Sequence, residues 1–229
     1  MTRSRVVGTA VLLLVLFGVM ASPGYSADGL RVGVRAGWPW SWISYDDPRG
    51  PQETDTDTRI FSGGMVLELP LWGSDRLSLV SGVTYVVRSG APLGIEMENQ
   101  PGDITGTRTS DWTYYCIAAP LLVKYSFTTV HLAPYVACGA EVGIPLKGEQ
   151  SSDFAPADGG PITGDIRDVT DDMRVVEFSL AAVGGLEFPV GSRVGFVELV
   201  YVHGLTDVWR DDLEEVRYRT LTVMGGVMF

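Results

Sequence analysis

The last thirteen residues, RYRTLTVMGGVMF at 217–229, decide the fold because their side chains alternate in character with a period of two. Leu221, Val223 and Val227 share one face with the terminal Phe229, whereas the opposite face consists of Thr220, Thr222, Met224, Gly226 and Met228. A period of two is that of a β-strand, whose successive side chains point to opposite sides. The sequence therefore predicts a closing strand with one apolar face and an aromatic end.

Seven further runs alternate in the same way and are bounded by Gly, Pro, Asp and Ser: 29–38, 59–71, 76–90, 112–126, 131–146, 174–188 and 193–205. The connections between the runs alternate in length. Short ones lie at 72–75, 127–130 and 189–192, and long ones at 39–58, 91–111, 147–173 and 206–216. This layout predicts an all-β fold, an eight-stranded antiparallel up-and-down transmembrane β-barrel with long loops at one rim.

Composition narrows the function classes. The chain has 229 residues, a net charge of −11 and 45% hydrophobic residues, which fits an ordered domain. Two cysteines exclude a disulfide scaffold or a cysteine-rich zinc module. The negative charge argues against a nucleic-acid partner, which needs clustered Lys and Arg. The four long connections hold 21 of the 28 acidic residues, so acidic charge gathers at one rim.

The first segment is typical of an export signal. Arg3 and Arg5 precede an apolar core at 11–20, and small residues follow. We expect a signal peptide at 1–27, cleaved after Ala21 or Ala27, and a barrel domain at 28–229. The alternative is an uncleaved membrane anchor, since the uncharged run is just long enough to span a bilayer.

Alternation alone does not orient the apolar faces, and a soluble lipocalin-like barrel would turn them inward. The export signal, the loop asymmetry and Phe229 favour the outward orientation, because a terminal aromatic on an alternating strand resembles the signal read by the outer-membrane assembly machinery. We therefore expect a protein of the bacterial outer membrane. Its expected partners are outer-membrane lipid and that machinery, and an envelope or surface protein is a candidate partner.

The barrel interior would then hold the charged residues of the opposite faces: Arg31, Arg35, Glu68, Arg88, Lys124, Glu141, Glu177, Glu187 and Glu198. Eight strands leave an interior just wide enough for side chains to fill. Because buried charges need partners, we expect a salt-bridged network that plugs the interior. The alternative is a gated pore or proton path.

Aromatic residues fall near the predicted strand ends, where we expect a membrane-interface girdle: Trp38, Trp40, Trp42, Trp72, Trp112, Tyr125, Tyr201 and Trp209. The alternative for WPWSW at 38–42 is a carbohydrate-binding patch. Pro120 and Pro134 lie inside predicted strands, so we expect bulges there.

Several segments resemble the PorT-like family of bacterial outer-membrane β-barrel proteins. They are YCIAAPLLVKY at 115–125, APYVACGAEVGI at 133–144, FSLAAVGGLEF at 178–188, GFVELVYVHGLTDV at 195–208 and LTVMGGVMF at 221–229. The resemblance implies an outer-membrane barrel and carries little about activity. Its named member assists a secretion system, a role that strand motifs alone do not transfer. Ala118 and Ala119 stand where the family often has an acidic residue.

Catalytic and metal chemistry finds little support. His131 and His203 would lie at opposite rims and cannot share a metal. A Ser-His-acid triad around His203 at the outer rim lacks a signature. The acidic segments DTDTR at 55–59 and 153–172 carry oxygen ligands that suit calcium, but solvated loop carboxylates are the commoner explanation for such clusters. Cys116 and Cys138 would face opposite sides of the wall, which predicts two free, buried thiols.

We therefore expect a protein of structural or interaction type, with acidic surface loops and no enzymatic activity, metal or cofactor. The first alternative is a small outer-membrane channel. The second is an outer-rim lipid-modifying enzyme centred on His203 or a soluble secreted binder.

Overall fold

The computed structural model describes residues 29–45, 52–56, 61–72, 74, 76–90, 95–100, 103–127, 132–156, 160, 163–207 and 216–229. Residues 31–229 form one compact unit, and the fold below is that of this unit. The predicted signal peptide, 1–27, lies outside the described residues. Within the part of the chain that the structure describes, no helix has the length and hydropathy needed to cross a membrane.

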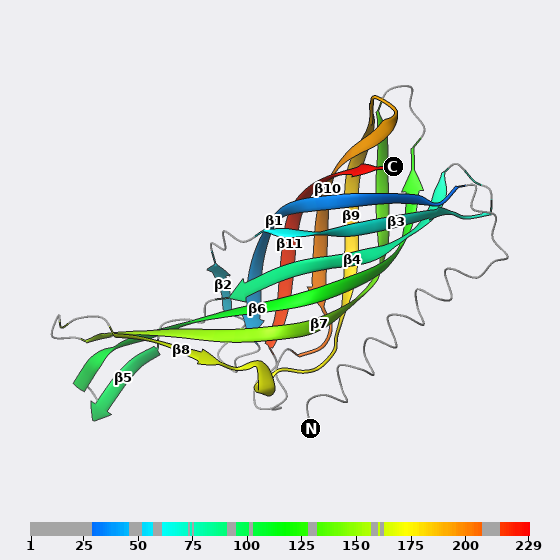
Figure 1. The fold of residues 1–229 in the computed structure, drawn as a ribbon. Helices are drawn as coiled ribbons and strands as arrows, with labels where there is room; N and C mark the ends of the chain where they lie inside the picture. The colour runs from blue at the N-terminus through cyan, green and yellow to red at the C-terminus, as the bar shows by residue number, and fades with distance from the viewer. Residues whose placement is uncertain are drawn as a thin grey trace. The chain divides into compact units, whose positions relative to one another are not determined.

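Eight antiparallel strands close into a barrel (Figure 1). They are β1 (Arg31–Tyr45), β3 (Ser62–Pro70), β4 (Leu77–Gly90), β6 (Asp103–Ser126), β7 (Ala133–Pro156), β9 (Glu177–Val190), β10 (Arg193–Gly204) and β11 (Val216–Met228). Each strand pairs with the next in this order, and β11 pairs with β1 to complete the ring. The predicted eight-stranded antiparallel barrel is confirmed.

Three shorter strands extend the sheet at the rim of the long connections. They are β2 (Gln52–Thr56), β5 (Ile95–Gln100) and β8 (Thr163–Asp168). β2 pairs with the far end of β1, β5 with the first residues of β6, and β8 with the last residues of β7.

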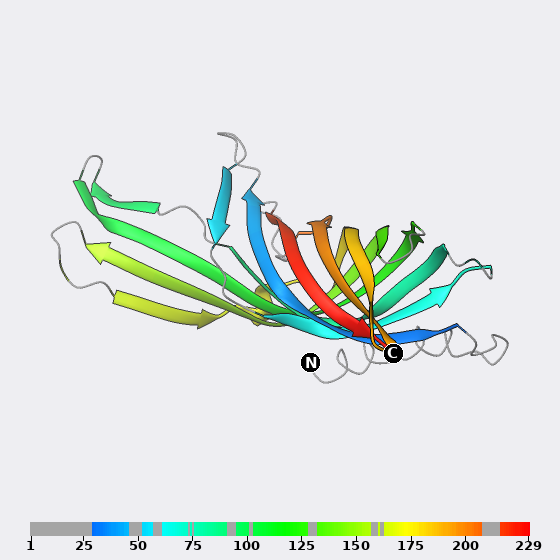
Figure 2. The same ribbon diagram turned by 90° about the horizontal axis from the view of Figure 1, so that it is seen from above.

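β6 and β7 stay paired well beyond the barrel wall. Their ladder continues to Gly106↔Pro156, whereas β4 and β9 leave them at Trp112 and Gly143. We call the four-stranded extension made by β5, residues 103–111, residues 144–156 and β8 the protruding sheet; Figure 2 shows it running out from the barrel. The long-connection rim thus carries a defined sheet.

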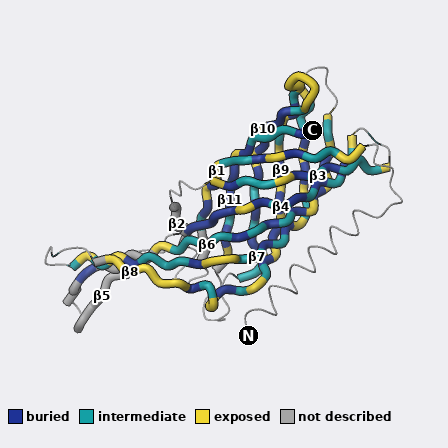
Figure 3. Tube along the Cα trace, viewed as in Figure 1, coloured by how far each residue is buried: buried dark blue, intermediate teal, exposed yellow. Residues whose placement is uncertain are grey.

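Apolar side chains cover the outside of the barrel and polar ones line its inside. Leu121 and Val223 are 46% and 42% exposed, whereas Arg35 and Glu198 are 8% and 7% exposed. Burial alternates with exposure along the wall strands, and in β9 it does so residue by residue over its first half (Figure 3). If this surface faced water, each exposed large apolar side chain would lack about 1.5–3 kcal/mol of the stabilisation that burial provides. An outer surface of this kind suits hydrocarbon and does not fit the lipocalin-like alternative.

The observed strands differ from the predicted ones mainly at the long-connection rim. The first strand continues to Tyr45 instead of ending at 38, and the predicted loops 91–111 and 147–173 contain strand residues. Their Gly, Pro and acidic residues favour turns when read locally. Pairing between β6 and β7 nevertheless holds both segments extended.

The bulges predicted at the two prolines are absent. The β6–β7 register runs unbroken past Pro120, and the β7–β9 register runs unbroken past Pro134. The register shift between β6 and β7 lies instead between Tyr115 and Cys116, just where the protruding sheet leaves the wall. Bulges bend a sheet and increase its twist, which suits that position.

Candidate functional site

The barrel interior gathers the charged residues that alternation placed there. Four cations and five carboxylates lie on the inward sides of their strands: Arg31, Arg35, Glu68, Arg88, Lys124, Glu141, Glu177, Glu187 and Glu198. All are buried except Arg31, whose side chain is 34% exposed. An unpaired charge in such a place costs several kcal/mol, so the partners of each decide what the interior can do.

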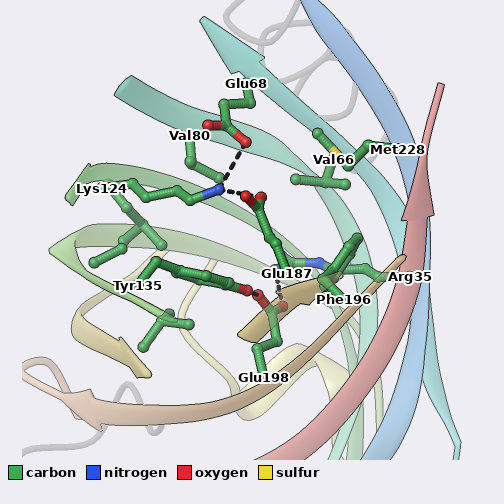
Figure 4. Close-up of a pocket in the computed structure, with 13 residues that line it drawn as sticks. Arg35, Val66, Glu68, Val80, Lys124, Tyr135, Glu187, Phe196, Glu198 and Met228 are labelled. Carbon is green, nitrogen blue, oxygen red and sulfur yellow. Dashed lines mark hydrogen bonds and ion pairs between the residues drawn. The ribbon is translucent and has the colours of Figure 1, made fainter. Parts of the chain in front are cut away.

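Arg31, Glu68, Lys124 and Glu187 form what we call the mouth cluster, near the short-turn rim. The Lys124 Nζ lies 2.9 Å from Glu68 Oε2 and 2.5 Å from Glu187 Oε1, so it bridges the two carboxylates (Figure 4). The Arg31 Nη2 lies 2.6 Å from Glu68 Oε1. The Ser78 hydroxyl donates to the same Glu68 oxygen at 2.6 Å. Both oxygens of Glu68 are thereby satisfied.

Arg35 and Glu198 form the next layer inward. The Arg35 Nη1 lies 3.0 Å from Glu198 Oε1, and its Nη2 donates to Thr84 Oγ1 at 2.9 Å. The Tyr135 hydroxyl donates to Glu198 Oε2 at 2.7 Å. The Tyr135 ring centroid lies 4.3 Å from Lys124 Nζ, which joins the layers. Together the mouth cluster and this pair hold three cations and three carboxylates, so their formal charge balances.

Arg88, Glu141 and Glu177 form what we call the upper cluster, toward the long-connection rim. The Arg88 Nη2 lies 2.7 Å from Glu141 Oε1, and its Nη1 lies 3.0 Å from Glu177 Oε2. The guanidinium carbon stands 3.9 Å from the centroid of the Tyr218 ring, a cation–π contact. The Tyr218 hydroxyl hydrogen-bonds with Ser179. Here one cation faces two carboxylates, so one negative charge is in excess.

The layers differ in how completely their buried polar atoms are hydrogen-bonded. Among the described residues, several buried atoms in the upper half lack a hydrogen-bond partner, including Ser62 Oγ, Arg88 Nε, Tyr114 OH and Glu177 Oε1. No atom of the mouth cluster or of the Arg35–Glu198 pair is in that state within the described part of the chain. Buried polar groups are normally paired, so the upper cluster is the less satisfied half.

The connection from β8 to β9 packs against this upper end. It contains the short 3₁₀ turn η1 (Thr170–Asp172), flanked by Val169 and Met173, which are both buried. Gly148 lies directly beneath, where an added Cβ would stand 2.5 Å from the Met173 sulfur. The Gly148 N–H donates to Thr170 Oγ1 at 2.9 Å, and its carbonyl accepts from Val169 N at 3.0 Å. These contacts fix residues 169–173, which we call the Val169–Met173 corner, against β7.

A cavity of about 20 Å³ remains between the layers. It is lined by charged and tyrosine side chains together with apolar ones, among them Val66, Val80, Phe196 and Met228 (Figure 4). That volume is roughly what one water molecule requires. Among the described residues, this part of the interior therefore leaves room for little more than one water molecule.

The protruding sheet and the following η1 carry an acidic surface. Residues 147–156 and 163–172 contain six carboxylates and two cations, a net charge of −4. The Lys147 Nζ lies 2.5 Å from Glu149 Oε1, and Arg167 Nη2 lies 3.4 Å from Asp172 Oδ2. Ile166 of β8 is 72% exposed amid these charges.

Neighbouring groups tune the charges of this surface. Partial burial and, secondly, the nearby Asp153 carboxylate raise the pKa of Asp111. Hydrogen bonds from the hydroxyl and N–H of Thr170 lower the pKa of Asp168. The hydrogen bond and charge of Glu149 raise the pKa of Lys147. Asp168 and Lys147 are thereby held in their charged forms at neutral pH.

Most residues of the predicted girdle lie on the outside of the barrel. Trp38 and Trp40 are exposed on β1, and the Trp42 ring, on the same face, meets Tyr201 with centroids 6.4 Å apart. Trp72 and Tyr125 are exposed at the short-turn end.

Trp112 is different, because it shares the side of β6 that carries the buried Tyr114 and Cys116. Its side chain thus belongs to the inward set, since alternation continues through residues 112–116. Trp209 lies outside the described residues.

The C-terminus lies at the short-turn rim. The backbone N–H of Phe229 donates to Val32 O at 2.8 Å, and the guanidinium carbon of Arg193 lies 4.4 Å from the Phe229 ring centroid. The side chain is exposed on the outward face. The final strand therefore presents the aromatic end that alternation indicated.

The structure describes one of the two histidines and both cysteines. The His203 ring packs against Tyr201 with centroids 6.5 Å apart, and His131 lies outside the described residues. Both cysteines are free, as expected. Cys116 is buried, whereas Cys138 is exposed on the outward face, so its predicted burial is wrong. Among the described residues, no three His, Cys, Asp or Glu side chains are grouped for a metal ion.

Sequence reasoning missed the neutral partners of the charge network: Ser78, Thr84, Tyr135, Ser179 and Tyr218. Each lies on the inward side of its strand, so the alternation that located the charges could also have located these hydroxyls.

The comparison with protein families agrees with the geometry. A family model described as the outer membrane protein beta-barrel domain matches residues 20–210. No curated protein matches. Among solved structures, the chain is similar to Ail, the attachment invasion locus protein of Yersinia pestis (14% identity, 88% of this chain and 99% of that chain, TM-score 0.38). It is also similar to Neisserial surface protein A (16% identity, 90% of this chain and 100% of that chain, TM-score 0.42). A third similar structure is the outer membrane protease OmpT of Escherichia coli (8% identity, 91% of this chain and 99% of that chain, TM-score 0.46).

The closed wall, its apolar outside and the family match over most of the chain lead to one assignment. The chain belongs to the outer membrane protein beta-barrel domain family and is a β-barrel protein of the bacterial outer membrane.

Proposed function

We propose that this protein is a non-conducting barrel that anchors the protruding sheet in the outer membrane, and that this sheet is its surface for interaction. The observation that carries the proposal is the contrast between the two parts. All nine charged side chains of the interior take part in ion pairs with one another, whereas the protruding sheet exposes an excess of carboxylates.

The interior supports the first half of the proposal. Three layers of ion pairs fill a barrel that is narrow because it has only eight strands. The Val169–Met173 corner adds apolar packing above them. An ion crossing this interior would have to displace several paired charges at once.

Conductance in planar bilayers tests this half. We expect no stepwise current from the purified chain, with a general porin reconstituted in parallel as the positive control. Reproducible steps whose size or selectivity changes in Lys124→Met would show that ions pass the mouth cluster, and would replace the proposal with a small channel.

The protruding sheet supports the second half. It continues the wall strands, because β6 and β7 remain paired from the barrel to Pro156 with a single register shift at Tyr115–Cys116. Rigid presentation lowers the entropy that a partner must lose on binding. A carboxylate-rich surface favours a cationic partner, such as an envelope or surface protein.

Site-specific photo-crosslinking in cells tests the second half. We expect a photoreactive residue at Ile166, exposed on the protruding sheet, to yield a defined protein adduct. The same residue at Phe178, exposed on the wall, should yield lipid adducts. Equal adduct patterns at both positions would contradict an interaction role for the sheet.

Two finer assignments belong to this proposal. The motifs at 115–125 and 195–208 support placing the chain near the PorT-like barrels. The exposed Phe229 on the closing strand supports recognition by the outer-membrane assembly machinery. The proposal contains no catalytic step.

A further inference from the structure

The two outer edges of the protruding sheet differ in regularity. The sheet order runs from β5 at one end to β8 at the other, and no described strand pairs with the far side of either. The β5–β6 ladder shifts register on both sides of Glu98. The β7–β8 ladder runs without a shift from Phe154↔Thr163 to Glu149↔Asp168. Irregular pairing protects an edge from adding strands, whereas a regular edge offers an open row of N–H and C=O groups.

The β8 strand is also held in place at its end. Asp168 accepts hydrogen bonds from Thr170 Oγ1 at 2.6 Å and Thr170 N at 3.0 Å. Thr170 in turn binds Gly148 of β7. An edge fixed in this way needs little further ordering when another strand pairs with it.

One face of β8 carries a definite side-chain pattern. Gly164, Ile166 and Asp168 alternate along that face, and Ile166 is 72% exposed. Asp153 of β7 pairs with Gly164, and its Oδ1 lies 2.7 Å from where a Cβ on Gly164 would stand. The face therefore presents a carboxylate over Gly164, an aliphatic side chain at Ile166, and a carboxylate at Asp168.

We propose that β8 accepts an extended segment of another protein by strand addition, and that this segment carries the pattern basic–x–aliphatic–x–basic. Cross-strand neighbours on one face lie about 4.5–5.5 Å apart between Cβ atoms. The aliphatic residue would pack on Ile166, and the two basic residues would meet Asp153 and Asp168. The backbone ladder would supply most of the affinity, and the side chains the specificity. This inference rests on the proposed interaction role of the sheet.

A synthetic peptide tests the proposal against the full chain in lipid nanodiscs. The probe is a capped seven-residue peptide in which lysine, valine and lysine alternate with threonine. Its binding is measured by calorimetry. We expect saturable one-to-one binding. Methylation of the alternate backbone nitrogens that face β8 should abolish binding, whereas methylation of the other set should not. Binding that survives both methylations would overturn strand addition.

Matched substitutions on the two faces of β8 test the pattern. We expect Asp168→Asn and Asp153→Asn each to weaken binding roughly two- to fivefold, the worth of one cross-strand charge pair. Ile166→Thr, which keeps β-propensity, should weaken it by a similar factor. Asp165→Asn removes the same charge from the opposite face and should have little effect. Equal losses for Asp165→Asn and Asp168→Asn would reduce the binding to unspecific attraction and overturn the pattern.

The outcome also separates this inference from the proposed function. A closed barrel that gives a crosslink at Ile166 and does not bind the peptide would overturn strand addition alone. A conducting barrel would overturn the non-conducting anchor whether or not the peptide binds. Each variant is checked for a folded barrel by circular dichroism, so that loss of binding reports on the β8 edge.

Discussion

The barrel interior and the protruding sheet use the same residue types under opposite conditions. Inside, four cations and five carboxylates are almost wholly buried and contact one another at 2.5–3.9 Å. In residues 147–156 and 163–172, two cations stand among six largely exposed carboxylates. Buried charges must be matched because desolvation is costly, whereas exposed ones are screened and need no partner. The interior charges are therefore committed to one another, whereas most of the sheet charges face solvent, as the proposed interaction role of the sheet requires.

The largest expected effect comes from removing the one cation of the upper cluster. Arg88→Met leaves Glu141 and Glu177 buried without their shared guanidinium. We expect a loss of about 3–5 kcal/mol in the free energy of unfolding, measured by urea titration in lipid vesicles with tryptophan fluorescence. Arg76→Met, at an exposed turn position, is the control and should change little. A loss as small as that of the control would mean that the upper cluster does not hold the barrel together.

A smaller effect is expected in the balanced mouth cluster. Lys124→Met deprives Glu68 and Glu187 of a partner, but Arg31 and Ser78 still contact Glu68. We expect a loss of roughly 2–3 kcal/mol. Adding Glu187→Met restores charge balance, so the double variant should recover part of the loss. Strictly additive effects would contradict a shared network.

The sequence predicted the wall better than the rim, for a physical reason. Alternation is imposed wherever one side of a strand meets lipid and the other a packed interior, so residues such as Val223 and Glu198 could be assigned from the chain alone. The protruding sheet meets water on its outward face, and its composition there is that of a loop. Its strands follow from the long β6–β7 pairing, which no local pattern in 91–111 or 147–173 shows.

The site shows the same limit. The alternation of side chains along each strand placed all nine charges on the inward face of the wall. It did not show which carboxylate each cation contacts. The division into a balanced mouth and an unbalanced upper cluster depends on strand register, for example Arg31↔Glu68 between β1 and β3. Register is set by contacts between distant strands, so it was not readable from single runs.

The excess negative charge of the upper cluster leads to a third prediction. Glu177→Gln removes the excess charge while keeping an oxygen for Arg88, and its present Oε1 has no partner among the described residues. We expect the free energy of unfolding to change by less than about 1 kcal/mol, because the lost ion pair and the relieved charge excess offset. Glu187→Gln, the matched change in the balanced cluster, should cost more. The reverse order would mean that the charge count does not govern the two halves.

The smallest expected effect lies in the protruding sheet and is local. The pKa of Asp168 is lowered in the folded chain by its bonds to Thr170. A lowered pKa means that the stabilisation is present above the unfolded pKa and is lost as the pH falls through the folded value. We expect the Thr170 amide resonance to titrate at a pH below the ordinary range of an aspartate, with only a small accompanying fall in the free energy of unfolding, because this carboxylate is exposed. In Asp168→Asn that titration should vanish. A Thr170 amide that titrates in the same way in both proteins would mean that Asp168 does not fix the end of β8, and the edge would then lack the support that distinguishes it from β5.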